Sequence, residues 1–140
     1  MSQSISELQA FLDGWVQDAN SVKPLFEAMS ASLAAMPGVS LDFKARPGIS
    51  YSLRARHEAQ KSRPLFVLVD IIDDDADARW MSVCFYADLV TDPEELGDTV
   101  PDGLFGEDAC CFDIDQQDWT LAEYMLERLA EDAVRAGSQG

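Results

Sequence analysis

An alternating pattern in residues 41–55, centred on a proline–glycine pair, restricts the fold more than any other feature. Every second residue is apolar from Leu41 to Ala45 and again from Tyr51 to Ala55, and the residues between them are charged or carry a hydroxyl. Successive side chains of a β-strand point to opposite faces of the sheet. The segment therefore predicts a β-hairpin with one buried face and one polar face.

The loop length of this hairpin follows from which residues must share a face. A two-residue loop at 47–48 would pair Arg46 with Ile49 and place a charged and an apolar side chain together. A three-residue loop pairs Arg46 with Ser50 and keeps polar residues opposite polar residues along both strands. We therefore expect the three-residue loop and the following cross-strand pairs: Arg46–Ser50, Lys44–Ser52 and Asp42–Arg54.

Three segments carry apolar residues at helical spacing. The first helix is expected to begin at Ser4, which can form a capping box with Glu7. The second has Pro24 in its first turn, where the missing N–H removes no hydrogen bond. The third is expected to begin near Asp118, which would act as its N-cap, and to end at Gly137.

Two further strands follow the hairpin, and a third is expected after a turn-rich region. Residues 64–72, PLFVLVDII, are apolar on both alternations, which is typical of a central strand covered on both faces. Residues 79–90 form the next strand, residues 91–109 are rich in turns, and CCFDI at 110–114 predicts a short edge strand. We expect one α+β domain over residues 1–140, with a largely antiparallel sheet of four to five strands, two N-terminal helices and one C-terminal helix.

The composition narrows the choice of partners. The chain has 26 acidic residues against 10 Lys and Arg, giving a formal net charge of −16, which disfavours binding to duplex nucleic acid or to anionic membranes. The N-terminus lacks the basic and apolar regions of a signal peptide, and no apolar run is long enough to span a bilayer. These features predict a cytoplasmic protein.

The positive charge is concentrated in one short segment of this acidic chain. Residues 44–63 hold six of the ten Lys and Arg, whereas the chain from Pro64 onward has 20 acids and three basic residues. Four of the cations and two serines share the polar face of the predicted hairpin, where arginines could hold a phosphate or carboxylate in bidentate geometry. The candidate ligand-binding residues are Lys44, Arg46, Ser52, Arg54 and Arg56.

Two other interpretations of the basic face remain open at this point. Lys and Arg on a solvent-facing strand also prevent aggregation through sheet edges. The same side chains could instead dock on the acidic C-terminal half of the protein. A long loop at 97–109 adds Leu104 and Phe105 as an apolar contact for a partner or a lid, or as an anchor in the core.

The remaining reactive side chains give weaker signals. His57 is the only histidine and could act as a general base, although no nucleophile motif accompanies it. The aspartates at 73–77 are expected to form a solvated turn, and those at 113–118 lack the glycine and glutamate of a calcium loop, so we expect no metal and no cofactor. The three cysteines are expected to be free thiols, with Cys84 buried in a strand and Cys110 and Cys111 adjacent.

The order of elements also carries a resemblance. The helix with LFEAMSASLAAMPGV, the segments ISYSLRAR and PLFVLVDII, and the closing helix resemble small bacterial domains of unknown function related to YdhG-like proteins. The resemblance covers about residues 24–136 and implies an α+β fold with a curved antiparallel sheet. It brings no catalytic residues, and the chain departs from it at residues 73–77 and in the segment VPDGLFGED.

Taken with the charge distribution, these features favour a non-catalytic binding or adaptor domain that holds an acidic small molecule or an acidic protein surface on its basic hairpin. A second hypothesis is a small enzyme acting on an anionic substrate, with His57 as base and the arginines positioning the substrate. A third is a structural subunit that forms a homodimer.

Overall fold

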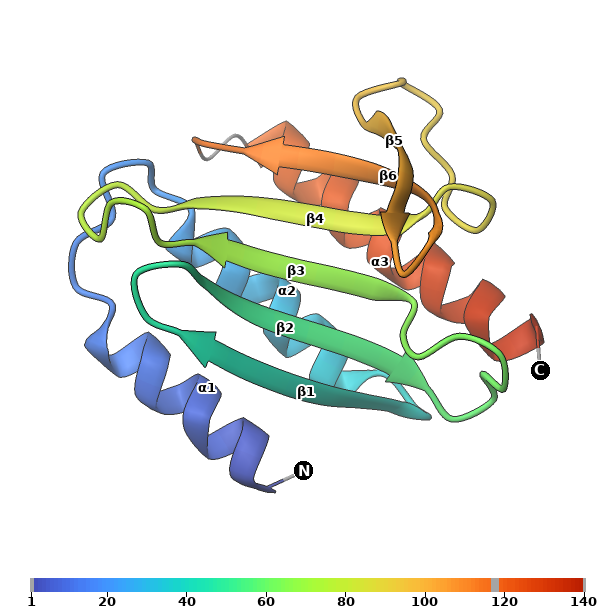
Figure 1. Cartoon of the computed structure of the whole chain (residues 1–140), viewed down its shortest axis with the longest axis horizontal. Coiled ribbons are helices and arrows are strands. Elements are labelled where there is room, and N and C mark those ends of the chain that lie inside the picture. Colours follow the sequence, from blue (N-terminus) through green and yellow to red (C-terminus); the bar gives the residue numbers. More distant parts are fainter. Residues whose placement is uncertain (1, 117–118, 140) are drawn as a thin grey trace.

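The computed structural model describes residues 2–116 and 119–139, which form an antiparallel six-stranded sheet and three helices (Figure 1). The strands lie in the order β1-β2-β3-β4-β6-β5, so that β1 and β5 are the two edges. The helices are α1 (Ser2–Gly14), α2 (Lys23–Ala35) and α3 (Trp119–Gln139). The strands are β1 (Val39–Arg46), β2 (Ser50–His57), β3 (Val67–Ile72), β4 (Trp80–Tyr86), β5 (Asp98–Leu104) and β6 (Glu107–Ile114).

The α+β class and the helix order are confirmed, whereas the expected count of four to five strands is wrong. The additional strand, β5, lies in the turn-rich region and contains Pro101 and Gly103, two residues that weaken a strand. An edge strand tolerates them because one of its sides makes no ladder hydrogen bonds. The segment expected as the edge strand belongs to β6, which lies between β4 and β5.

The β1–β2 hairpin has the register that the alternation predicts. Arg46 pairs with Ser50, and the pairs Lys44–Ser52 and Asp42–Arg54 follow along the strands. The three-residue loop is closed by a 2.9 Å hydrogen bond from the Ile49 N–H to the Arg46 carbonyl, and Gly48 takes a φ of 83°. Parity alone therefore predicted which side chains share the polar face.

All three helices pack on one face of the sheet. In Figure 1, α2 and α3 cross behind the strands and α1 lies along the β1 edge. Side chains from five strands form the buried inner face: Leu41, Phe43, Leu53, Ala55, Val67, Val69, Ile71, Met81, Val83, Phe85, Phe112 and Ile114. Among the described elements, no helix covers the opposite face, which we call the outer face. Leu68 and Ile72 of β3 are only half-buried there, so the expectation that β3 is covered on both faces is wrong.

The helix ends differ from the sequence prediction in two places. α1 begins at Ser2, two residues earlier than expected, and the capping side chain of Ser4 lies outside the described residues, as does Asp118. α3 continues through Gly137 to Gln139, so Gly137 does not end the helix. A Cβ at Gly137 would lie 2.9 Å from Nε2 of His57, so the glycine serves close packing between α3 and β2.

α2 agrees with its prediction. It begins at Lys23 with Pro24 in its first turn, and its buried residues are Leu25, Phe26, Met29, Ser30 and Leu33. Within residues 2–116 and 119–139, none of the helices combines the length and apolar character needed to cross a bilayer.

Candidate ligand pocket

The β5–β6 hairpin is bent by an irregularity in its pairing. Val100 pairs with Ala109 and Leu104 pairs with Glu107, so residues 101–103 lie opposite a single residue of β6. A bulge of this kind bends a strand and increases its twist. A Cβ at Gly103 would lie 2.7 Å from Cγ1 of Val100, so the bulge requires glycine at that position.

The tip of this hairpin reaches across the outer face toward β2. The two turn residues, Phe105 and Gly106, have φ values of 51° and 81°, the left-handed conformation that a type I′ turn requires. In Figure 1 the turn projects over β4 toward β3. The Phe105 ring centre lies 5.9 Å from the guanidinium carbon of Arg54. The hairpin therefore brings an aromatic side chain from one edge of the sheet to the arginines near the other.

A pocket of about 490 Å³ lies between the hairpin tip and the β1–β2 face. It is lined by Ser40, Leu41, Asp42, Arg54, Arg56, Pro64, Leu65 and Phe105. Phe105 is 56% exposed, and the pocket is open to solvent. Its lining therefore combines two cations, Arg54 and Arg56, with the carboxylate of Asp42 and with apolar residues.

The two pocket arginines take no part in the ion pairs found in the described parts of the chain. Those pairs are made by Arg63, Arg79, Arg128 and Arg135. The Nε atom of Arg54 is buried and has no hydrogen-bond partner among the described residues. A guanidinium outside these ion pairs can donate hydrogen bonds to a ligand carboxylate or phosphate, in competition with Asp42, which lies opposite Arg54 and lines the same pocket.

The other predicted ligand-binding residues lie on the same face but outside the pocket lining. Lys44 and Arg46 are exposed. Ser52 is buried and its hydroxyl donates a hydrogen bond to the Asp70 carboxylate. Burial raises the pKa of Asp70, and the hydrogen bond from Ser52 and the charges of Arg54 and Arg46 partly oppose that increase. Asp70 therefore adds an acidic side chain to this face, hydrogen-bonded to Ser52 and close enough to Arg54 and Arg46 to be affected by their charges.

The two candidate loop residues have different surroundings. Leu104 is 2% exposed and belongs to the core, whereas Phe105 lies on the surface and lines the pocket. Leu104 therefore anchors the loop in the core, whereas Phe105 is the residue that remains available for an apolar contact.

His57 lies away from the pocket arginines. Its Nδ1 accepts a 3.1 Å hydrogen bond from the Ala59 N–H, and its ring packs between Gly38 and Gly137. Strand parity places His57 on the inner side of β2 and Arg56 on the outer side. The arrangement therefore does not bring the candidate base and the pocket arginines together.

One member of the basic segment docks on the acidic half of the chain. Arg63 forms ion pairs with Glu107 at 2.7 Å and Asp88 at 2.9 Å, and its guanidinium lies 4.0 Å from the centre of the Tyr86 ring. The hydrogen bonds to Glu107 and Asp88 raise the pKa of Arg63. These contacts tie the loop before β3 to the tip of the β5–β6 hairpin at Glu107 and to the turn after β4 at Asp88, so Arg63 supports the pocket from outside it.

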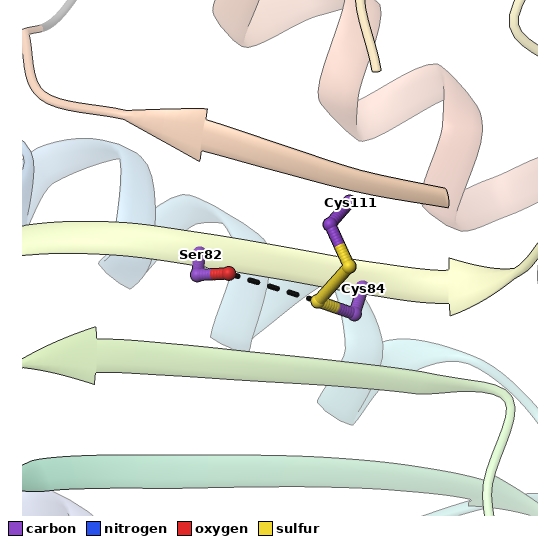
Figure 2. The surroundings of a disulfide bond; sticks show 3 residues. All are labelled: Ser82, Cys84 and Cys111. Carbon is purple, nitrogen blue, oxygen red and sulfur yellow. Dashed lines mark hydrogen bonds between the residues drawn. A yellow bond between two sulfur atoms is a disulfide. The ribbon is translucent and has the colours of Figure 1, made fainter. Parts of the chain in front are cut away.

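The expectation of three free thiols is wrong. Cys84 of β4 and Cys111 of β6 form a disulfide, with 4.2 Å between their Cα atoms, and both are half-buried on the outer face (Figure 2). Cys110 is the free cysteine of the described chain and is buried on the inner face. The pairing depends on β6 lying beside β4, which the spacing of the cysteines does not reveal.

Asp74, Asp75 and Asp77 are exposed, as expected of a solvated turn, whereas Asp73 differs from that expectation. Asp73 is buried and accepts hydrogen bonds from Nε of Arg79 at 2.8 Å and from the Gly48 N–H at 2.9 Å. Burial raises the pKa of Asp73, but the hydrogen bonds from Arg79, Gly48 and Tyr51, together with the charge of Arg79, lower the pKa overall. No group of three or more metal-ligating side chains is found within residues 2–116 and 119–139.

Comparison with known proteins assigns neither a family to the chain nor a function to the pocket. No family model, no curated protein and no solved structure matches the chain. The resemblance to YdhG-like domains therefore stays a prediction, and the pocket is interpreted from its own residues.

Proposed function

We propose that this protein is a cytoplasmic, non-catalytic binding module that holds a small acidic ligand between the β1–β2 face and the tip of the β5–β6 hairpin. The observation that carries the proposal is the convergence of Arg54, Arg56 and Phe105 on one pocket. The arginines come from β2, near one edge of the sheet, and Phe105 comes from the hairpin at the other edge. The two arginines take no part in the ion pairs found among the described residues.

Each part of the pocket suits a different part of such a ligand. A guanidinium donates two parallel hydrogen bonds to a carboxylate or phosphate. The exposed apolar side chains of Pro64 and Phe105 offer contact to the body of the ligand. A volume of about 490 Å³ falls within the range of small-molecule sites, which favours a metabolite over a protein surface.

The geometry favours binding over catalysis. A general base must come within hydrogen-bond reach of the atom that it deprotonates. His57 is on the inner side of the sheet and does not line the pocket that contains Arg54 and Arg56.

The proposal is tested by isothermal titration calorimetry with citrate, pyrophosphate and adenosine monophosphate as probes. The double variant Arg54→Ala/Arg56→Ala removes the pocket cations. The matched control Lys44→Ala/Arg46→Ala removes the same charge from the same face outside the pocket. We expect saturable binding of at least one probe to the wild type and the control, and at least tenfold weaker binding to the pocket variant.

Two results would overturn the proposal. The first is no saturable binding of any probe at millimolar concentration. The second is an equal loss of affinity in the pocket variant and the control, because nonspecific charge attraction would then explain the binding. Circular dichroism of each variant establishes that the fold is retained.

A further inference from the structure

The disulfide lies on the same face as the two pocket arginines and in the same cross-strand row as Arg54. Arg54 is opposite Leu68, Leu68 is opposite Cys84, and Cys84 is opposite Cys111. Neighbouring strands are about 4.8 Å apart, so Arg54 and Cys84 are separated by roughly 10 Å across two strand spacings. A small molecule bound to Arg54 that extends across β3 by about this distance would reach the disulfide, which lies outside the pocket lining.

The bridged sulfurs and the third cysteine have different access to solvent. Cys84 and Cys111 are half-buried on the outer face, where no described helix covers them. Cys110 points to the inner face, and burial, with the charges of Asp92 and Asp98, raises the pKa of its thiol to about 11. Thiol–disulfide exchange requires access to a sulfur atom, so the outer-face pair is suited to it and Cys110 is not.

A hydroxyl makes the two bridged sulfurs chemically unequal. The Ser82 Oγ lies 3.6 Å from Sγ of Cys84, and Figure 2 shows the hydroxyl directed at that sulfur. A disulfide sulfur carries no proton, so Ser82 must be the donor. The same hydroxyl can stabilise a thiolate that forms on Cys84. Cys84 is therefore the better leaving group, and Cys111 is the sulfur that an incoming thiolate attacks.

We propose that an anionic low-molecular-weight thiol, held by its carboxylates on Arg54 and Arg56, exchanges with the Cys84–Cys111 disulfide. This inference rests on the proposed function, because it uses the same arginine pocket. It names the ligand class as a carboxylate-bearing thiol and adds a site of reversible modification at Cys111.

The exchange proceeds in two balanced steps. The thiolate of the first small molecule attacks Sγ of Cys111, a new disulfide forms between them, and the Cys84–Cys111 bond breaks with its electron pair leaving on Cys84. Cys84 takes a proton from water. A second thiolate attacks the small-molecule sulfur of the mixed disulfide and releases Cys111 as a thiolate. Two small thiols become one disulfide, and two electrons pass to the protein.

Glutathione is a suitable probe because it carries two carboxylates and a thiol on a tripeptide scaffold. Its thiol lies on the central residue, between the two carboxylates, so a carboxylate bound to an arginine holds the thiol a short distance away, and the length of the arginine side chain covers the rest of the roughly 10 Å between Arg54 and Cys84. Glutathione diethyl ester keeps the scaffold and the thiol but removes both carboxylates, and 2-mercaptoethanol is a small neutral thiol. These three reagents separate recognition of the anion from intrinsic reactivity of the disulfide.

The experiment measures the rate at which each reagent reduces the disulfide of the full chain, with acid-quenched samples counted by mass spectrometry. We expect glutathione to react at least tenfold more slowly with Arg54→Ala/Arg56→Ala than with the wild type or with Lys44→Ala/Arg46→Ala. The rates with the ester and with 2-mercaptoethanol should agree among the three proteins. Ser82→Ala should slow reduction by all reagents, and peptide mapping should place the first glutathione adduct on Cys111.

The contrary outcomes are distinct from failure of the proposed function. Equal glutathione rates in all three proteins would overturn the inference even if citrate binds the pocket as expected. An adduct on Cys84 would overturn the assigned direction of attack. If citrate, pyrophosphate and adenosine monophosphate do not bind in calorimetry but glutathione still discriminates between the variants, the inference stands and the ligand class narrows to carboxylate-bearing thiols. Loss of both responses would remove the proposed function as well.

Discussion

Arg79 and Arg54 both lie close to aromatic rings of the same protein, but only Arg79 is enclosed by partners. Arg79 pairs with the buried carboxylate of Asp73 at 2.8 Å, and both side chains are largely shielded from solvent. Its guanidinium also lies over three rings, at 5.3 Å from Phe11, 5.5 Å from Trp15 and 5.3 Å from Tyr51. Arg54 has a single ring, at 5.9 Å, and its buried Nε has no partner among the described residues.

The difference indicates which charges hold the fold and which are available to a ligand. Arg79 joins α1, the β1–β2 hairpin and the turn before β4, so its contacts are structural. Arg54 lines a pocket and has bonding capacity left. Carboxylates show the same contrast, because Asp73 is fully bonded whereas Asp132 of α3 is 0% exposed and neither of its oxygens has a hydrogen-bond partner in the described chain.

The largest expected effect comes from Asp132, whose buried carboxyl group has no hydrogen-bond partner among the described residues. Burial raises the pKa of its carboxyl to about 8, with Arg135 and Arg63 opposing the shift and Asp88 adding to it. The unfolded chain loses this proton near pH 4, whereas the folded protein keeps it to about pH 8. Between these values the unfolded state binds fewer protons, so the free energy of unfolding falls as pH rises, by up to about 1.4 kcal/mol per pH unit.

Asp132→Asn removes the titrating group and should flatten this dependence. Urea denaturation at pH 5, 6, 7 and 8 should show the variant gaining stability relative to the wild type, with a gap that widens by about 4 kcal/mol over the series. Subtracting the free energy of unfolding of the wild type from that of the variant at each pH cancels the contributions of the titrating groups that both proteins contain. Parallel stability curves would show that Asp132 ionises freely in the folded protein.

Arg79→Met should destabilise the protein by about 3 kcal/mol, because it leaves the buried charge of Asp73 without its cation while the methionine keeps much of the apolar packing. The matched change Arg54→Met should alter stability by less than about 0.5 kcal/mol, as expected for a side chain without structural partners. Urea denaturation at pH 7 measures both. Equal losses in the two variants would mean that Arg54 is also structural, and the contrast between the clusters would fail.

The two hairpins show why part of the fold could be predicted from the sequence and part could not. In β1–β2, strict alternation and a Pro-Gly turn determine the register, because a slip by one residue would bury arginines. In β5–β6, Pro101 and Gly103 interrupt the pattern, and Leu104 is the only buried residue of β5. A strand with so little apolar periodicity gives no signal of its own, and its pairing becomes visible only in the folded chain.

The candidate site, too, could be predicted only in part from the sequence. The arginines of β2 could be identified because alternation puts Arg54 and Arg56 on one face, and Phe105 because it is apolar in a polar loop. Their meeting depends on strand order, which brings β5–β6 to the far edge, and on the bulge that bends the hairpin back. The Cys84–Cys111 bond depends on strand order too, because β6 must lie beside β4.

The smallest expected effect concerns Phe105, where binding and stability should change in opposite directions. The left-handed conformation of this turn residue suits Asn or Gly and costs a bulky residue roughly 1 kcal/mol. Phe105→Asn should therefore stabilise the protein in urea denaturation by less than that amount, because it also removes an exposed cation–π contact at Arg54 worth roughly 0.5–1 kcal/mol. It should also weaken anion binding, because the ring no longer lines the pocket beside Arg54.

Phe105→Leu separates these two consequences. It keeps a bulky residue in the left-handed conformation and removes the aromatic ring, so affinity should fall as in the asparagine variant without the gain in stability. If both variants bind as tightly as the wild type, the ring contributes nothing to the pocket and Arg54 and Arg56 alone hold the ligand. If binding falls in both and stability rises only with asparagine, the turn retains a strained phenylalanine at the cost of stability because the pocket needs its ring.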